Sequence, residues 1–156
     1  MISQHGYLPG VMASTANGIQ VRLSNNVVYA APMHLMKITA EATDAVVTYD
    51  PTVVLGGMVV RSGITATRID LLPTAALIIG ATKGAVVGMC VKFIIRNTTA
   101  QTCTLGISAT GLSAGTDNST LNVVLNSSTE FLLQYTNVTP GSEAITVWTL
   151  ATAIVH

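Results

Sequence analysis

The sequence predicts an all-β fold: an antiparallel β-sandwich or barrel with one short helix and an extended N-terminal arm. Hydrophobic residues make up 49% of the 156 residues. They occur as short runs of Val, Ile, Leu and Thr that are broken by Gly, Asn, Ser and Pro. In the second half, strand-like runs recur about every 8–12 residues with turn residues between them, which favours a sandwich or barrel over alternating strands and helices.

Charged residues are unusually scarce in this chain. Asp, Glu, Lys and Arg make up 9% of it, and the mean hydropathy is +0.57, whereas an ordinary soluble domain is about 25% charged. So few charges cannot coat the outside of a domain, so we expect neighbouring copies to cover much of the surface. The net charge is zero and the basic residues are scattered, which argues against a nucleic-acid partner because phosphate binding needs a basic patch.

Residues 1–46 differ from the rest of the chain and are predicted to form the arm. They hold four of the six methionines and two of the three histidines, and their hydrophobic periodicity is weak. A turn signal at Asn25-Asn26 and a short apolar run after it predict one or two short strands. We expect this arm to pack largely on a neighbouring subunit.

The sandwich domain is predicted to span residues 47–156 and to begin with two interrupted apolar segments. The β-branched run 53–60 contains Gly56-Gly57, which suggests a strand with a bulge. Residues 72–80 have Pro73 near the start and Gly80 at the end, the asymmetry expected of a two-turn helix. The most apolar stretch, 71–95, is interrupted by Pro73 and Lys83, so we expect no membrane span.

Regular alternation then predicts a series of antiparallel strands. In the segment 86–96, Val91, Phe93 and Ile95 alternate with Lys92 and Arg96, so the apolar side chains should face the core. A loop and a returning strand should follow, and their inward side chains are Cys103, Leu105 and Ile107. Similar alternation marks 121–125, 131–135 and 144–153, with turns between them short enough for antiparallel neighbours. We expect Phe131 and Leu133 to complete this core.

The two cysteines, Cys90 and Cys103, flank the expected hairpin turn. They form a disulfide if their Cα atoms lie within about 7 Å of each other. The favoured interpretation is two free thiols buried on strands, since Cys is among the most frequently buried residue types.

No catalytic centre, metal site or cofactor is predicted. The histidines, His5, His34 and His156, have no spacing typical of metal ligands, and the acidic residues are dispersed. Glycine-rich phosphate loops and nucleophile motifs are absent from the sequence. Asp70 should have a structural role where the short helix begins, and a cluster with Arg61 and Arg68 would fix a turn or a subunit boundary.

One short motif recurs in the second half of the chain, the acceptor sequence for N-linked glycosylation. Its four asparagines lie in predicted loops and are Asn97, Asn118, Asn126 and Asn137. A chain rich in Ser and Thr produces such triplets by chance, and chance is the favoured explanation.

Five stretches carry a resemblance to a known family: 55–63, 70–76, 84–88, 91–98 and 131–148. Together they resemble a β-sandwich domain of structural proteins of large and giant DNA viruses, where the domain often follows collagen-like repeats. The resemblance covers about residues 47–156. It implies a jelly-roll-like fold, a homotrimer or similar symmetric assembly, contacts with other structural proteins of the virion, and no enzymatic activity. No collagen-like repeat precedes the domain in this sequence, which favours a capsid or surface-lattice subunit over a fibre tip.

The resulting functional hypothesis is a self-assembling viral structural protein, used as a capsid, decoration or filament subunit. The alternative is a trimeric head domain that binds a host receptor or glycan through its loops. An exposed cluster of Trp and Tyr on one loop face would favour that alternative. Trp148 and Tyr135 instead lie on predicted strands, which favours the structural role. An enzyme is the least favoured of the three.

Overall fold

The computed structural model describes residues 14–15, 18–22, 28–31, 36–115 and 121–154. It divides into two compact units, residues 1–35 and residues 36–156. In the first unit, three short strands form an antiparallel sheet in the order β1-β2-β3. They are β1 (Ser14–Thr15), β2 (Gly18–Arg22) and β3 (Val28–Ala31). The arm was expected to hold one or two strands, so its described part contains more regular structure than its weak periodicity predicts.

The division between the units falls after residue 35, whereas the sequence places the end of the arm at residue 46. The reason is strand β4 (Lys37–Glu41), which pairs in parallel with β5 (Gly57–Arg61) over its whole length. These residues therefore belong to the main sheet and not to the arm. Strand β4 is short and has a charged residue at each end, so hydrophobic alternation did not predict it.

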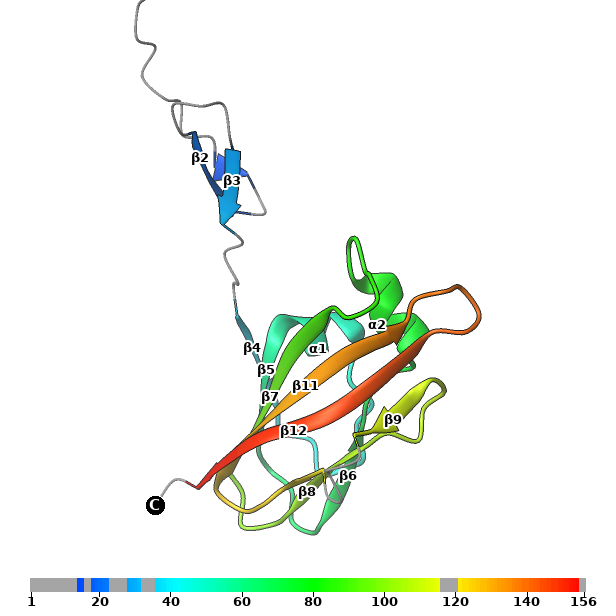
Figure 1. Ribbon diagram of the computed structural model, residues 1–156. Coiled ribbons are helices and arrows are strands. Elements are labelled where there is room, and N and C mark those ends of the chain that lie inside the picture. Colours follow the sequence, from blue (N-terminus) through cyan, green and yellow to red (C-terminus); the bar gives the residue numbers. More distant parts are fainter. Residues whose placement is uncertain (1–13, 16–17, 23–27, 32–35, 116–120, 155–156) are drawn as a thin grey trace, which may run out of the picture. The chain divides into compact units, whose positions relative to one another are not determined.

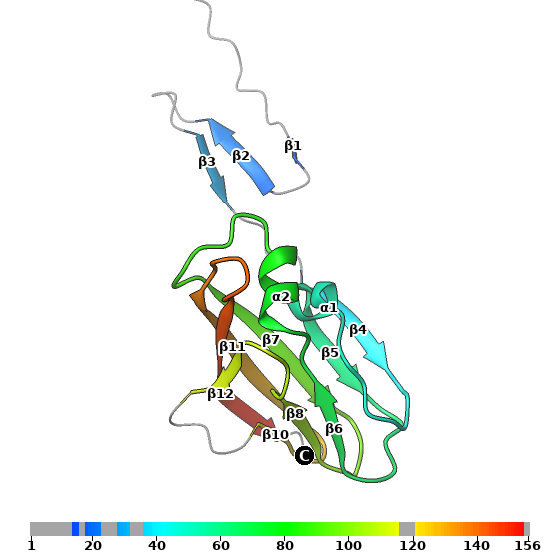
Figure 2. The same ribbon diagram turned by 90° about the vertical axis from the view of Figure 1, so that its right-hand side faces the viewer.

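The second unit is built on two sheets (Figures 1 and 2). The larger sheet has six strands in the order β4-β5-β7-β11-β12-β9, and the smaller has three in the order β10-β8-β6. The remaining strands of the larger sheet are β7 (Cys90–Asn97), β9 (Leu112–Ala114), β11 (Ser127–Asn137) and β12 (Ala144–Ile154). Those of the smaller sheet are β6 (Arg68–Leu71), β8 (Cys103–Gly106) and β10 (Asn122–Val123). The fold of this unit is therefore mostly β.

The expected antiparallel pairing holds for only part of these sheets. The pairs β7–β11, β11–β12 and β8–β10 are antiparallel, but β4–β5, β5–β7, β6–β8 and β9–β12 are parallel. The predicted hairpin of residues 91–96 with 103–107 was wrong, because β7 and β8 lie in different sheets. Both strands direct their apolar side chains into the same interior, and alternation alone does not distinguish strands that pair from strands that face each other.

The core lies between the inner faces of the two sheets, and its residues follow the predicted alternation. From the larger sheet, Phe93, Ile95, Phe131 and Leu133 are fully buried. Cys103, Leu105 and Val123 face them from the smaller sheet and are buried too. Ile145 and Val147 of β12 are buried, as their alternation predicts. The Phe93 ring also meets the edge of the Tyr49 ring, with a centroid separation of 5.6 Å.

Two short helices, rather than the one expected, lie beside the sheets (Figure 2). Helix α2 (Ala75–Ala81) is the predicted helix, and the Thr74 side chain caps it by accepting from the Leu77 amide at 3.3 Å. Helix α1 (Pro51–Gly56) was missed, since residues 53–60 were expected to form one bulged strand. Asp50 caps α1 by accepting from the Thr52 amide at 2.8 Å, and Pro51 occupies the first turn, where no amide hydrogen is needed.

The burial of Phe93 gives a direct test of the core. Phe93→Ala is expected to lower the free energy of unfolding by about 3–5 kcal/mol, because the change removes a fully buried ring and leaves a cavity. Lys92→Ala, on the solvent side of the same strand, should change it by no more than about 0.5 kcal/mol. Urea denaturation of both variants measures the difference, and equal losses would show that the assigned faces are wrong.

Candidate functional site

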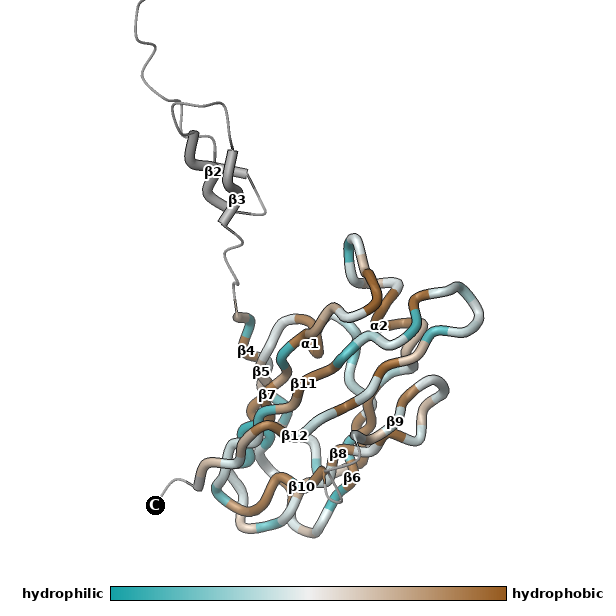
Figure 3. The backbone as a smooth tube through the Cα atoms, viewed as in Figure 1, coloured by the Kyte–Doolittle hydropathy of each residue, from teal (hydrophilic) through white to brown (hydrophobic). Residues whose placement is uncertain are grey.

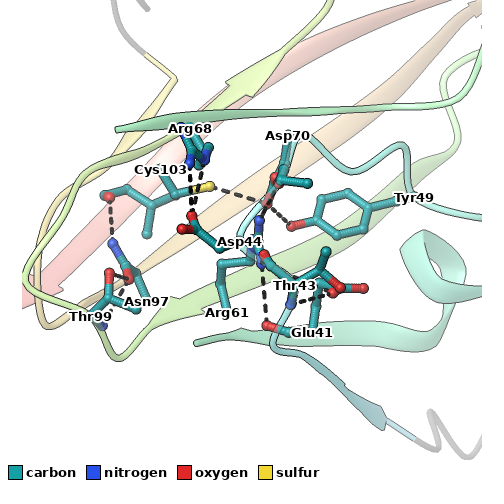
Figure 4. A network of polar contacts seen from close by, with 12 residues as sticks. Glu41, Thr43, Asp44, Tyr49, Arg61, Arg68, Asp70, Asn97, Thr99 and Cys103 are labelled. Atoms are coloured by element: carbon teal, nitrogen blue, oxygen red, sulfur yellow. Dashed lines mark hydrogen bonds and ion pairs between the residues drawn. The ribbon is translucent and has the colours of Figure 1, made fainter. Parts of the chain in front are cut away.

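The most highly organised polar group in the molecule is a buried ion pair between the two sheets (Figure 4). Arg61 ends β5 in the larger sheet, and Asp70 lies on β6 in the smaller one. Both side chains are 0% exposed, and Arg61 Nε donates to Asp70 Oδ2 at 2.8 Å. The ion pair therefore joins the two sheets across the interior of the unit.

The rest of the Arg61 guanidinium holds the segment that leaves β4. Its Nη1 donates to the carbonyl of Thr43, and its Nη2 donates to the carbonyl of Ala45 at 2.7 Å. The Glu41 carboxylate lies 4.0 Å from Nη1. A planar guanidinium with five donors suits such a site, because it satisfies several fixed acceptors at once.

One carboxylate oxygen of Asp70, Oδ2, accepts hydrogen bonds from three side chains. Besides Arg61, the Tyr49 hydroxyl donates to Oδ2 at 2.6 Å and Cys103 Sγ lies 3.2 Å from it. Burial, and then the negative charge of Asp70, raises the pKa of Tyr49 and raises the pKa of the Cys103 thiol to about 12. Both groups stay protonated at neutral pH, so they act here as hydrogen-bond donors and not as nucleophiles or bases.

Of the expected cluster of Arg61, Asp70 and Arg68, the structure brings the first two together and places the third elsewhere. Arg68 Nη2 lies 2.9 Å from Asp44 Oδ1 in a partly exposed ion pair. The Thr65 hydroxyl and amide also donate to Asp44, and these bonds together with the Arg68 charge lower the pKa of Asp44. Arg68 and Asp70 are two residues apart and lie on the same face of β6. Arg68 begins the strand and reaches the partly exposed Asp44, whereas Asp70 lies further along the strand and is fully buried.

Both charged side chains of the buried ion pair are closed off from solvent by the described residues. Two surface hollows border this part of the unit, with volumes of about 660 and 520 Å³, and neither is lined by Arg61, Asp70 or Cys103. Tyr49 lines the smaller hollow, but its hydroxyl is turned inward to Asp70. The geometry supports a structural role for the cluster, which holds the two sheets and the segment 41–45 in place.

The four candidate glycosylation asparagines are in different environments. Asn97 is the last residue of β7 and is 0% exposed. Its Nδ2 donates to the carbonyls of Gln101 at 2.6 Å and Val123 at 3.1 Å, so this amide is engaged inside the fold. Asn126 is exposed with a positive φ of 48°, and Asn137 ends β11 half-buried. Asn118 lies outside the described residues.

The two cysteines are both free, as favoured from the sequence, but only Cys103 is buried. Cys90 is exposed at the first position of β7, so the expectation of two buried thiols was wrong for this residue.

The three histidines, His5, His34 and His156, lie outside the described residues. Within the described parts of the chain, no three His, Cys, Asp or Glu side chains come close enough together to hold a metal ion. No helix in those parts has the length and hydropathy to cross a membrane.

The second notable feature is the number of large apolar side chains that are exposed. Figure 3 shows that apolar residues are distributed along most elements of residues 36–156. Ile38, Val86 and Val87 are each more than half exposed. Strand β6 contributes one of these side chains because its alternation is inverted. It turns Asp70 inward and leaves Ile69 50% exposed.

Beside Ile69, the larger hollow runs over the outer side of the smaller sheet. Val46, Leu71 and Ile107 line part of it, and none of its lining residues carries a charge. Gly106 forms part of its floor, where a Cβ atom would come within 2.6 Å of the Leu71 side chain.

No known family model, characterised protein or solved structure matches this chain. The chemistry of the buried cluster and the character of the surface therefore carry the functional argument.

The ion pair gives a second prediction. Asp70→Asn is expected to lower the free energy of unfolding by about 3 kcal/mol or more, because it leaves the buried Arg61 charge with only the partly exposed Glu41 carboxylate, 4.0 Å away, as a counter-ion. Asp44→Asn removes the partner of Arg68 at the surface and serves as the matched control, with a much smaller expected effect. Chemical denaturation at neutral pH measures both variants. An Asp70→Asn protein as stable as the parent would rule out a supporting role for the pair.

The cysteines give a third prediction. Iodoacetamide should modify Cys90 alone in the native protein, since Cys103 is buried and its pKa is raised to about 12. Intact-mass measurement should therefore show one adduct per native chain and two after unfolding. The pKa of Cys103 is higher in the folded protein than the unfolded value of 9.0. The free energy of unfolding should therefore fall as the pH rises from about 9 towards 12, because the unfolded chain loses this proton first. Rapid double labelling of native protein would contradict this assignment.

Proposed function

We propose that this protein is a self-assembling structural subunit, a capsid, decoration or filament component of a virus particle, without catalytic activity. The observation that carries the proposal is the exposure of large apolar side chains on a chain that is only 9% charged. Large exposed apolar patches are rare on monomeric proteins and mark surfaces that contact other molecules.

The distribution of these side chains supports assembly through several surfaces. Met36 and Ile38 lie at the β4 edge of the larger sheet, while Val46 and Ile69 lie beside the uncharged hollow. Val86 and Val87 lie in the loop that follows α2. A subunit with apolar areas on more than one side is suited to contact more than one neighbour, as a lattice or a closed ring requires.

The buried polar cluster is also suited to a structural role. It supplies an ion pair that joins two sheets, rather than a titratable group within reach of a substrate. The resemblance of residues 47–156 to a viral β-sandwich domain supports the same proposal. The jelly-roll class is part of it: two sheets around one core support that class, and the four parallel strand pairs depart from it.

The receptor- or glycan-binding alternative has less support in the described residues. Such a head would present aromatic side chains on its loops, whereas Tyr135 is fully buried on β11. Trp148 lies on β12, and its Nε1 donates to Gln134 of the neighbouring strand at 3.2 Å.

The fourth prediction concerns the assembly itself. At micromolar concentration the full chain should form a stable homo-oligomer, with a trimer of the 16.2 kDa subunit as the expected form. Light scattering coupled to gel filtration measures the mass. A well-behaved monomer would contradict the proposal.

A truncated chain of residues 36–156 tests the role of the arm in the same experiment. It keeps the whole second unit, including β4, and should fold but assemble less strongly than the full chain. Unchanged assembly of the truncated chain would place the contacts between subunits on the second unit alone.

A further inference from the structure

Strand β12 has an open edge at its C-terminal end. Its eleven residues pair with β11 along one side, from Ala144 to Ile154. On the other side, β9 pairs only with residues 145–147, and that contact ends at the bond from the Gly115 amide to the Val147 carbonyl. Residues 150–154, here named the open edge, have no strand on this side among the described parts of the chain.

The open edge differs from the other sheet edges of the same unit. Strand β4 places Lys37 and Glu41 at the opposite edge of the larger sheet, while β9 and β10 have only three and two residues. Charge and short length are the usual means by which proteins prevent edge strands from pairing with other chains. The open edge has neither charge nor proline, and its residues 150–153 are exposed. An extended strand is the partner that satisfies such a row of backbone donors and acceptors.

The sequence of the open edge is nearly a palindrome. It reads Leu150, Ala151, Thr152, Ala153 and Ile154. In an antiparallel pair of two identical strands centred on Thr152, position 150 lies opposite position 154 of the second copy, and position 151 lies opposite position 153. The two central threonines then face each other. Apolar–apolar and Thr–Thr pairs are among the favourable cross-strand pairs, and no like charges come together.

Leu150 lies at an irregularity in the pairing of β12 with β11. The pairing of β12 with β11 shifts at this point, from Thr149 opposite Phe131 to Ala151 opposite Glu130. Leu150 is therefore left without a cross-strand neighbour on β11, and it is 48% exposed. A second strand on the open side would provide the neighbour that β11 does not.

We propose that residues 150–154 pair antiparallel with the same residues of a second copy of this chain, about a two-fold axis at Thr152. The larger sheets of two subunits then become one continuous sheet. This contact deepens the proposed function and rests on it, because it names one of the surfaces through which the subunit assembles. A two-fold pair cannot form inside a threefold ring, so in the expected assembly this contact joins subunits of two different trimers. A two-fold contact of this kind closes on itself, because each subunit uses its open edge once and that edge cannot then pair with a third chain.

Cysteine cross-linking of the full chain tests the register of this contact, in a Cys90→Ser background that removes the exposed native thiol. Thr152→Cys should form a disulfide-linked dimer under mild oxidation, because each chain meets its copy at this position. Ala151→Cys and Ala153→Cys should each cross-link weakly alone but efficiently when the two proteins are mixed. Ladder positions alternate in geometry, so the two designs together cover both kinds of strand pair.

Ser142→Cys provides the matched control, since Ser142 is exposed in the turn between β11 and β12, at the other end of β12 from the open edge. Non-reducing gels should show the dimer for the β12 variants and at most a trace for Ser142→Cys. Failure of both β12 designs, or equal cross-linking at Ser142→Cys, would overturn the proposal.

Charged substitutions at Thr152, on the proposed two-fold axis, give an independent test that does not need a disulfide. Thr152→Lys and Thr152→Glu should each weaken the dimer contact at least tenfold, because each places two like charges opposite each other. An equimolar mixture of the two should restore association as a mixed pair. Thr152 is exposed, but its hydroxyl lies 3.1 Å from the hydroxyl of the buried Thr129 on β11, a contact that both variants remove. Thermal unfolding of each variant therefore verifies that the chain is still folded.

Native mass measurement distinguishes a failure of the strand contact from a failure of the proposed function. If the parent protein is an oligomer but the mixture restores nothing, the strand contact is wrong and the proposed function stands. If the parent protein is a monomer, both are wrong.

Discussion

The buried pair of Arg61 and Asp70 is the interaction on which the rest of this fold depends. It joins the two sheets through opposite charges, beside the buried hydrogen bond from Asn97 of β7 to the Val123 carbonyl of β10, and it is 0% exposed at both ends. The same guanidinium holds the carbonyls of Thr43 and Ala45, and the same carboxylate receives the Tyr49 hydroxyl. Two of the few charged side chains are buried together here, so neutralising either one leaves the other buried without its ionic partner.

The sequence allowed the core to be predicted better than the topology. Alternation identified Phe93, Ile95, Phe131 and Leu133 as inward-facing, because burial has a period of two in any strand. It did not show which strands pair, and the expected hairpin of β7 with β8 is divided between two sheets. Helix α1 had a readable signal in Asp50 followed by Pro51, but the β-branched residues that follow favoured a strand.

Only part of the buried polar cluster could be predicted from the sequence. Arg61 and Asp70 are close along the chain and were expected to act together, whereas the contributions of Tyr49 and Cys103 depend on how separate segments meet in space. Asn97 illustrates a different limit of sequence reasoning, at a motif for which chance was the favoured explanation. Its triplet matches a glycosylation acceptor, yet its amide is fully buried and donates to Gln101 and Val123. A three-residue motif describes local chemistry and contains no information on burial.

The inverted alternation of β6 has a consequence for how this chain selects a single fold. By hydropathy alone, β6 would sit better if it slid by one residue, since Ile69 and Leu71 would then enter the core and Asp70 would reach water. The slipped arrangement would leave Arg61 buried without Asp70 as its counter-ion. The ion pair thus makes the more hydrophobic register the less stable one, and electrostatics decides the alignment of a strand that the hydrophobic effect alone would misplace.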